Sequence, residues 1–415
     1  MPKGFYVLIA AQFASGLADN ALMILGIFFL QEQGYPAWWS PLLKFSFNLA
    51  YVLLASLVGP IADAFSKGHL MAWLNVLKML GVIFLLLGVH PLLAFSVTGL
   101  AAAVYAPAKY GLVTEVVPAS GLVKANGWLE GSVVMSVILG VALGGALTAW
   151  HSVDLVWAAR HGWSHWGLVG VSTQILGAFM VVLAVYAVSV LLNAGLPRQL
   201  TLNVRRPLSW RALQWSEFWQ NHLQLWKDPL GGVSLFVTTL YWGVGAVLQF
   251  AVLAWAQTSL GLSMQRAAYL QALVAVGVIL GAMMAARCFR IFNARKALPW
   301  GLLLAGMLPL LAVTENLAWA IPMLMLAGWA GGMLLVPMNA VLQHRGFKIL
   351  SPGRSIAVQG FNENLSVLLM LAVYSFLVAW GVTLLTIMMG MACVLMVGML
   401  PLCLQRHRRR AMPGL

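Results

Sequence analysis

The sequence is poor in acidic residues and in charge altogether. Asp and Glu together number 10 in 415 residues, charged residues make up 8% of the chain, and hydrophobic residues make up 62%. Soluble globular domains carry roughly a quarter of charged residues, so that class is excluded. Apolar runs of about 20 residues recur along the chain, and such runs predict helices that cross a bilayer. We therefore expect an all-α membrane protein.

Cysteine pairs and catalytic motifs are missing as well. The three cysteines have no paired spacing, which argues against a disulfide framework; they are Cys288, Cys393 and Cys403. No Gly-x-Ser-x-Gly, Gly-x4-Gly-Lys-Ser/Thr or His-Glu-x-x-His pattern occurs. Three histidines share one loop, where we interpret them as interfacial residues rather than metal ligands; they are His151, His161 and His165. We predict no enzyme, no cofactor and no metal site.

Hydropathy predicts twelve membrane spans. They lie near residues 5–30, 39–62, 69–89, 92–113, 125–149, 166–192, 231–255, 266–287, 297–314, 318–342, 354–380 and 383–404. A polar interruption at 193–230 separates an N-terminal six-helix bundle, residues 1–192, from a C-terminal bundle, residues 231–415. Apolar residues recur in the linker every three or four positions, including Trp215, Trp219 and Leu223. This spacing predicts an amphipathic helix on the membrane surface.

The basic residues are concentrated on one side of the predicted spans. With the N-terminus inside, 19 of the 24 lysines and arginines fall in cytoplasmic segments. This asymmetry satisfies the positive-inside rule and places both termini in the cytoplasm. It also explains the net charge of +14 without nucleic acid as a partner.

Charged residues lie inside predicted spans, where lipid would surround them. Asp19, followed by Asn20, falls near the middle of the first span, and Lys109 falls in the fourth. An unpaired charge there costs several kcal/mol, so these residues are candidates for a polar site. Asp19 and Lys109 could form a static ion pair, or they could bind the ammonium and phosphate of a headgroup. Lys78 could snorkel to the surface or pair with Asp63.

The two halves of the chain repeat a pattern. In the first half Pro107 precedes Glu130 by 23 residues, and in the second Pro337 precedes Glu363 by 26. An amide lies four residues before each glutamate, and a basic turn separates proline from glutamate. Such parallel repeats are typical of two-bundle transporters with a central site. The two glutamates could contact substrate, or they could close the cytoplasmic ends against basic residues; those residues are Lys124, Arg354 and Lys67.

Small residues are abundant in the fifth and eighth spans. Gly127, Gly131, Gly140 and Gly144 lie in the fifth, and residues 272–281 of the eighth are similarly rich in glycine and alanine. Small faces allow helices to approach closely. We interpret them as packing surfaces, with the alternative that the two spans meet and part sideways to admit a lipid tail.

The loop after the second span reads Gly-Pro-Ile-Ala-Asp-Ala-Phe-Ser-Lys-Gly from Gly59. It resembles the signature loop of the major facilitator superfamily, with Asp63 four residues after the glycine and Lys67 following. Ala64 stands where the family usually has a basic residue. A carboxylate near the start of the third span can be held by helix N–H groups and by the lysine.

Longer blocks are more specific. They read AQFASGLADNALMI, GPIADAFSKG, YAPAKYGLVTEVVP, LVKANGWLEGS, VPMNAVLQHRG and SIAVQGFNENLSVLLMLAVYS. They closely resemble the bacterial lysophospholipid transporter family of the major facilitator superfamily over nearly the whole chain. The resemblance implies twelve helices in two pseudo-symmetric bundles in the bacterial inner membrane. It also implies flipping of lysophospholipids, chiefly lysophosphatidylethanolamine, from the outer to the inner leaflet, followed by reacylation by a cytoplasmic acyltransferase/acyl-carrier-protein synthetase.

The resemblance carries over to individual positions. The matching family positions are Asp19, Asn20, Lys109, Lys124, Glu130, Asn339, Glu363 and Asn364. Gln249 stands where enterobacterial members have an arginine, and His344 replaces a more usual acid. We count Gln249 with the expected substrate-binding residues, although the departure removes a cation from the second half.

These features together suggest alternating access by a monomer, with the headgroup held between the halves. The acyl chain is expected along the apolar surface of the second half, at Trp242, Leu248 and Phe250. Two other functions remain open. The chain could be a proton-coupled exporter of drugs or small amphiphiles, with Asp19 or Glu130 titrating, or a scaffold for a lipid-modifying enzyme that transports nothing.

Overall fold

The computed structural model describes residues 3–35, 39–149, 173–196, 208–262 and 264–410, and this part of the chain is helical without strands. The long helices are α1 (Lys3–Glu32), α2 (Trp39–Leu53), α3 (Ala55–Ala64), α4 (Lys67–Leu86), α5 (Pro91–Val116), α6 (Leu122–Ala149), α8 (Thr173–Ala194), α9 (Trp215–Lys227), α10 (Gly231–Thr258), α11 (Met264–Cys288), α12 (Pro299–Ala312), α13 (Leu317–Ile349), α14 (Pro352–Ala379) and α15 (Leu384–Arg410). Short 3-10 helices are η1 (Ala119–Gly121), η4 (Arg211–Leu213) and η5 (Ile291–Ala297).

Each predicted span has a helical counterpart in this part of the chain. Ten helices are long and apolar enough to cross a membrane, and α2 and α3 add a span bent by 68°. The ninth predicted span corresponds to α12, which has only 14 residues. The start of the sixth, at residues 166–172, lies outside the described residues. The all-α membrane class is confirmed.

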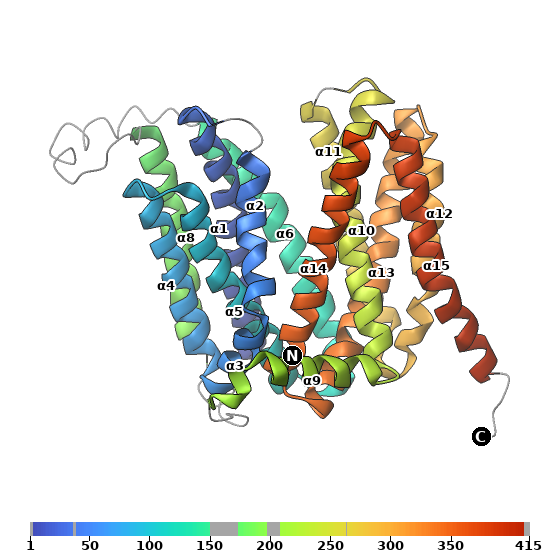
Figure 1. Cartoon of the computed structure of the whole chain (residues 1–415), viewed down its shortest axis with the longest axis horizontal. Coiled ribbons are helices and arrows are strands. Elements are labelled where there is room, and N and C mark those ends of the chain that lie inside the picture. Colours follow the sequence, from blue (N-terminus) through green and yellow to red (C-terminus); the bar gives the residue numbers. More distant parts are fainter. Residues whose placement is uncertain (1–2, 36–38, 150–172, 197–207, 263, 411–415) are drawn as a thin grey trace. The chain divides into compact units, whose positions relative to one another are not determined.

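Two compact units of contacts divide the chain. Unit 1 comprises residues 1–116, 135–218 and 352–360, and unit 2 comprises residues 117–134, 219–351 and 361–415. Each unit thus includes a short segment of the other half of the sequence: α6 contributes to both, and so does α14 (Figure 1).

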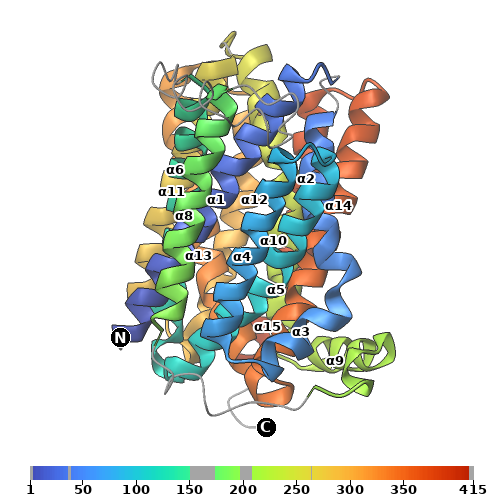
Figure 2. The ribbon, with the colours of Figure 1, turned by 90° about the vertical axis from the view of Figure 1, so that its left-hand side faces the viewer.

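Unit 1 is built around α1, α4, α5 and α8. Helices α4 and α5 pack on one another, α8 packs on both α1 and α4, and α2 covers α5 (Figure 2). The core between them contains Leu22, Val82, Phe95 and Phe179, each at most 1% exposed. This apolar layer lies beside the polar residues of α1 and positions them inside the helix bundle.

Unit 2 is built around α13, which packs on α10, α11 and α12. Its apolar clusters include Val247, Leu308 and Leu395, and separately Trp255 and Leu324. The contact between α11 and α13 depends on glycines. Added Cβ atoms on the α11 and α13 glycines would overlap with carbonyl oxygens of the facing helix; the glycines are Gly277, Gly281, Gly328 and Gly332.

Glycines also bring α6 close to its neighbours. In unit 1, Gly140 and Gly144 face backbone atoms of Leu17 and Ala21 in α1. In unit 2, a Cβ on Gly127 would lie 2.7 Å from the Cβ of Ala286 in α11. The fifth and eighth predicted spans therefore do meet, and small residues at these contacts serve close packing.

Helix α9 confirms the helix predicted in the linker and lies transverse to α10 (Figure 1). Phe218 and Leu225 are buried on one side. Trp215, Trp219 and Leu223, spaced four residues apart, are 43–52% exposed on another. This exposed apolar stripe is the face that the amphipathic pattern assigns to the membrane surface.

Candidate functional site

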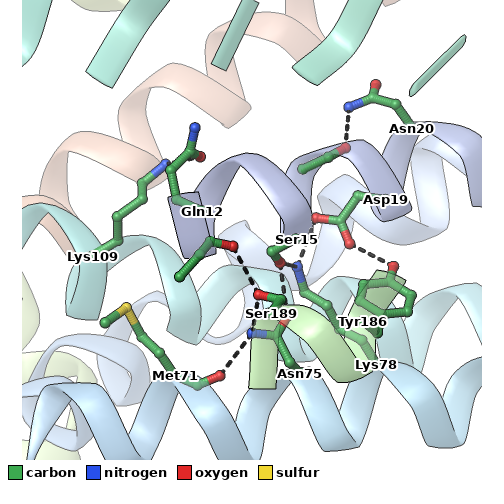
Figure 3. A network of polar contacts seen from close by, with 12 residues as sticks. Gln12, Ser15, Asp19, Asn20, Met71, Asn75, Lys78, Lys109, Tyr186 and Ser189 are labelled. Carbon is green, nitrogen blue, oxygen red and sulfur yellow. Dashed lines mark hydrogen bonds and ion pairs between the residues drawn. The ribbon is translucent and has the colours of Figure 1, made fainter. Parts of the chain in front are cut away.

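The polar centre of unit 1 is the carboxylate of Asp19. One oxygen, Oδ2, accepts a hydrogen bond from Nζ of Lys78 at 2.6 Å, and Oδ1 accepts one from the Tyr186 hydroxyl at 2.7 Å (Figure 3). The three residues come from α1, α4 and α8. Lys78 has 1% of its side chain exposed, whereas Asp19 has 20%. The ion pair is therefore buried at its cationic end and partly accessible at its anionic end.

The ammonium of Lys78 is enclosed by polar and aromatic groups. It also donates to Oγ of Ser15 at 3.0 Å. It lies 5.0 Å from the ring centre of Tyr105 and 5.9 Å from that of Tyr186. Aromatic faces attract cations at such distances, and the attraction grows when water is excluded. The surroundings thus stabilise a charged lysine inside the membrane-spanning part of unit 1.

A chain of hydrogen bonds continues from this pair. Ser15 donates to Oδ1 of Asn75 at 2.8 Å, and Asn75 donates to Oγ of Ser189 at 3.1 Å. Ser189 in turn donates to the carbonyl of Ala11 at 2.8 Å. All three polar side chains are at most 1% exposed. The network ties α1, α4 and α8 together and fixes the level at which Asp19 and Lys78 meet (Figure 3).

The structure corrects the expected ion pairs. Asp19 pairs with Lys78, not with Lys109, and Lys78 therefore does not pair with Asp63. Nζ of Lys109 lies 3.5 Å from Oε1 of Gln12 and 4.4 Å from the ring centre of Tyr110. The reason is that Lys109 meets α1 at Gln12. Gln12 precedes Asp19 by seven residues, which is about 10 Å of helix.

The amide of Asn20 bonds within its own helix, to the carbonyl of Gly16 at 2.7 Å. Its Cβ faces Gly140 of α6. This bond is the back-bonding typical of amides between packed helices.

A second polar cluster lies in unit 2 between α6 and α13. Asn126 and Gln343 exchange two hydrogen bonds, of 2.8 and 2.9 Å. One turn along, Nδ2 of Asn339 donates to Oε1 of Glu130 at 3.1 Å. Each of the four side chains is at most 3% exposed. Glu130 and Asn339 were expected site residues, whereas Gln343 was not, although its spacing of four residues from Asn339 places both on one face of α13.

The signature loop is held within unit 1 by the first turn of α14. Asp63 accepts a hydrogen bond from the backbone N–H of Gly353 at 2.8 Å. A Cβ on Gly59 would lie 2.8 Å from the Cα of Arg354, so only glycine fits this approach. The carboxylate thus faces the N-terminal end of a helix, where partial positive charge gathers.

The basic residues proposed for gating have other partners. Lys67 forms an ion pair with Glu115 at 2.5 Å, and Arg354 forms one with Glu217 at 2.9 Å. The suggested contacts of these two cations with Glu130 or Glu363 stay predictions. Lys124 is exposed on the first turn of α6.

Other expected substrate residues lie on two helices of unit 2. On α10, Trp242 and Phe250 are each 37% exposed, Gln249 is exposed, and Leu248 packs partly into the apolar core. The backbone carbonyl of Gln249 accepts a hydrogen bond from the side chain of Gln271. On α14, Glu363 and Asn364 are half-buried; their suggested substrate contacts stay predictions.

Asp228 precedes α10 and connects two backbone segments. Its carboxylate accepts hydrogen bonds from Nε and Nη2 of Arg345, at 2.9 and 2.5 Å, and from the N–H of Gly231 at 2.7 Å. The Arg345 hydrogen bond, more than the backbone bonds, lowers the pKa of Asp228. Half-burial lowers the pKa of His222 in α9, because burial disfavours the imidazolium.

The described residues contain no group of three or more histidine, cysteine or acidic side chains that could hold a metal. The three loop histidines, His151, His161 and His165, lie outside the described residues.

Comparison with known proteins adds two findings at the sequence level. The profile of the Major Facilitator Superfamily matches residues 8–348. The lysophospholipid transporter LplT of Shigella flexneri is 35% identical over 408 residues, covering 98% of this chain and 96% of that protein. The lysophospholipid transporter LplT of Enterobacter sp. (strain 638) is 35% identical over 410 residues, covering 98% and 97%.

Solved structures give the fold. The Escherichia coli fucose:proton symporter FucP superposes with a TM-score of 0.75 at 14% identity, covering 95% of this chain and 97% of that one. The human organic anion transporter MFSD10 superposes with a TM-score of 0.73 at 15% identity, covering 97% and 100%. At such identities the likeness concerns the fold alone, and it confirms the predicted fold class.

Proposed function

This chain belongs to the lysophospholipid transporter family of the major facilitator superfamily, and we propose that it flips lysophospholipids from the outer to the inner leaflet of a bacterial inner membrane. Relatives of the chain are transporters, and the chain is a transporter rather than an enzyme. Both of its termini lie in the cytoplasm in this proposal, as the distribution of basic residues favours.

The observation that carries the proposal is the buried pair of Asp19 and Lys78. A charged side chain at the centre of a transmembrane helix costs about 2.5–3.5 kcal/mol even on the lowest insertion scales. A pair of apolar side chains would therefore stabilise the packing of these helices better. Asp19 keeps one-fifth of its side chain exposed although its partners Lys78 and Tyr186 are buried. A partly accessible carboxylate at this depth suits a ligand with an ammonium group that crosses the membrane.

The headgroup site in this proposal lies along α1. Asp19 meets the ammonium, and Lys109, beside Gln12, meets the phosphate. Gln12, which contacts Lys109, lies about 10 Å from Asp19 along α1. This distance exceeds the length of a phosphoethanolamine group, so either the side chain of Lys109 must extend toward Asp19 or the headgroup must move between the two residues. Asn20 lies next to Asp19 with its amide bonded to α1, which leaves its carbonyl oxygen for the ligand.

The single acyl chain lies against exposed residues of α10 in this proposal. Trp242 and Phe250 present aromatic surface there, with Gln249 between them, while Leu248 supports this face from the core side. Phe250 is stacked on Tyr374 of α14, with ring centres 6.3 Å apart. On α14, Glu363 and Asn364 are the remaining polar candidates for contact with the headgroup.

Transport proceeds by alternating access of the two sequence halves, residues 1–192 and 231–415, in a monomer. We assign Glu130 to the cytoplasmic gate rather than to substrate, because its carboxylate is 3% exposed and bonded to Asn339. The signature loop, through Asp63, is the second part of the gate. A cytoplasmic acyltransferase/acyl-carrier-protein synthetase then consumes the flipped lipid.

Reconstitution tests the proposal. Purified protein in vesicles should move fluorescent lysophosphatidylethanolamine from the outer leaflet, as measured by loss of dye accessible to an external quencher. The doubly acylated lipid should move much more slowly, because a second tail doubles the apolar volume that must be housed. Equal rates for the two lipids would contradict the single-chain site.

The same assay separates the two other functions. A proton-coupled exporter would stop when the proton gradient is dissipated, and it would move its substrate outward. A scaffold would move no lipid under any condition. Asp19→Asn protein should insert normally yet lose most lysolipid movement, and wild-type rates in that variant would remove Asp19 from the headgroup site.

A further inference from the structure

The ion pair of Asp19 and Lys78 is asymmetric. Lys78 is 1% exposed, and Ser15, Tyr105 and Tyr186 surround its ammonium. Asp19 is 20% exposed. A substrate can therefore reach the carboxylate but not the ammonium. This difference separates the roles of the two residues, because only one of them can touch a lipid.

The ammonium determines the charge of the site. One side of Asp19 is exposed, while α4 and α8 cover the other with Lys78 and Tyr186. Burial disfavours the charged form of a carboxyl, and a cation within hydrogen-bond distance favours it. Without Lys78 the desolvation would remain and the compensating cation would be gone. The carboxyl would then take up a proton and lose its attraction for an ammonium.

The other groups that face Asp19 cannot replace this cation. They are hydroxyl-bearing aromatic residues: Tyr186 on α8, Tyr51 on α2 and Tyr105 on α5. On α6, the residues that approach α1 beside Asp19 are Ser136 and Gly140, which carry no charge. Lys109 contacts Gln12, at a level about 10 Å away along α1.

Tyr186 determines orientation. Its hydroxyl donates to Oδ1, while Lys78 donates to Oδ2, so each oxygen has one fixed donor. A carboxylate held at both oxygens cannot rotate freely. Its remaining lone pairs then point in a defined direction, which lowers the entropy lost when a ligand binds.

We propose that Lys78 is a positioning residue for the headgroup site: it keeps Asp19 ionised and, with Tyr186, holds its accessible edge in place without touching the lipid. This inference rests on the proposed function, because Asp19 is the ammonium-binding group. It differs from a purely structural ion pair in one measurable respect. A structural pair stabilises the fold, whereas a positioning lysine also determines how transport depends on pH.

The test is the Lys78→Met variant in vesicles with equal pH on both sides. Methionine has nearly the length of lysine and carries no charge. Lysolipid movement should fall roughly tenfold at neutral pH and recover as the pH is raised, because Asp19 then ionises without its cation. Wild-type movement should change little over the same pH range, because the ion pair with Lys78 is intact. A direct readout is the infrared band of a protonated carboxylic acid, present in the variant and absent from the wild type.

Two further variants isolate the charge. The double variant Asp19→Asn/Lys78→Met leaves no uncompensated charge at this position and should fold, yet it should show neither the acid band nor transport at any pH. Tyr186→Phe should lower transport several-fold at every pH, because orientation is impaired while the cation remains. A uniform loss in Tyr186→Phe and a pH-dependent loss in Lys78→Met together separate orientation from charge.

Three results would overturn the inference. Wild-type transport by Lys78→Met at all pH values would make the lysine dispensable. Loss at all pH values without the acid band would give Lys78 a role other than holding Asp19 ionised. Transport by the double variant would reduce the pair to structure. If wild-type protein moves no lysolipid, the proposed function fails instead, and the infrared comparison still shows whether Lys78 keeps Asp19 ionised.

Discussion

At the scale of single residues, Asp228 shows how one carboxylate can hold two helix ends. It bonds the guanidinium of Arg345 at the end of α13 and the N–H of Gly231 at the start of α10. The side chain of Asp228 is 7% exposed and that of Arg345 is 30% exposed, so these bonds are shielded from water on the carboxylate side. Hydrogen bonds to charged groups of this kind contribute about 1.5–3 kcal/mol each.

Asp228→Asn should therefore lower the free energy of unfolding by about 1.5–3 kcal/mol at neutral pH. Arg345 lowers the pKa of Asp228 below its ordinary value of 3.8 in the folded protein. Because the folded pKa is the lower one, the stabilisation is complete above the unfolded pKa and disappears as the pH falls through the folded pKa. Thermal unfolding in detergent at several pH values should show wild type and variant converging only in acid.

Glu217→Gln provides a matched control for that measurement. Glu217 also pairs with an arginine, Arg354, but 34% of its side chain is exposed and 18% of its partner's. Exposed pairs of this kind contribute about 0.2–1 kcal/mol. Equal destabilisation by the two variants would show that burial of Asp228 adds nothing.

The residues of the candidate site were more predictable than their partners. Asp19 and Lys109 stood out because a charge in an apolar run is rare, and that signal needs no knowledge of packing. The partner of Asp19 depends on which lysine reaches the same level on a neighbouring helix. Lys78 lies on α4. This helix packs against α8, which in turn packs against α1. Sequence spacing carries no information about that contact.

At the scale of helices, the crossing of α11 and α13 makes the strictest demand on sequence. Gly281 faces the carbonyl of Trp329, and Gly328 faces the carbonyl of Val274, so an added methyl group on either has no space. We expect Gly281→Ala and Gly328→Ala each to lower the free energy of unfolding by about 1–3 kcal/mol. Thermal unfolding followed by tryptophan fluorescence measures the effect.

Gly390→Ala is the control for helix propensity in the same unit. Gly390 lies on α15 with open space where its Cβ would be. Alanine there should be neutral or stabilising by about 0.5–1 kcal/mol, because glycine is the poorer helix former. A stable Gly281→Ala protein would mean that α11 and α13 can move apart at little cost.

Helix existence was predictable and helix interruption was not. Long apolar runs predict spans because lipid leaves the backbone no alternative to internal hydrogen bonds. The bend between α2 and α3 at Leu54 has no glycine or proline at the break, so the sequence carried no local signal for it. The sequence explains part of the shortness of α12, because Pro299 is its first residue.

At the scale of the whole molecule, the equivalent helices α6 and α14 each form hydrogen bonds with the other half of the sequence. The first turns of α6 contact α13 through Asn126 and Gln343, and the first turn of α14 contacts α3 through Gly353 and Asp63. In both cases a helix of one half bonds to a helix of the other. The proline–basic turn–glutamate repeat predicted this equivalence of α6 and α14, because both begin after the basic turn. It could not predict the bonding partners, which lie more than 200 residues away.

If transport requires the halves to separate, the contact between Asn126 and Gln343 must break in each cycle. Replacing both residues by cysteine, after the three native cysteines are changed to serine, allows a reducible bifunctional thiol reagent that spans the two amide side chains to link α6 to α13. We expect this cross-link to stop lysolipid movement in vesicles and reduction to restore it, because a covalent bond cannot open on the time scale of transport.

The matched control joins two helices of the same half. Ser234 in α10 approaches Met338 in α13, with Oγ and Sδ 3.9 Å apart. A cysteine pair at these positions involves the same helix α13, yet it links helices that move together in a rocking mechanism. Cross-linking this pair with the same reagent should leave transport nearly unchanged. Full transport by the protein cross-linked at 126 and 343 would instead show that the lipid passes without separation of α6 from α13, and the proposed cytoplasmic gate at Glu130 would have to be abandoned.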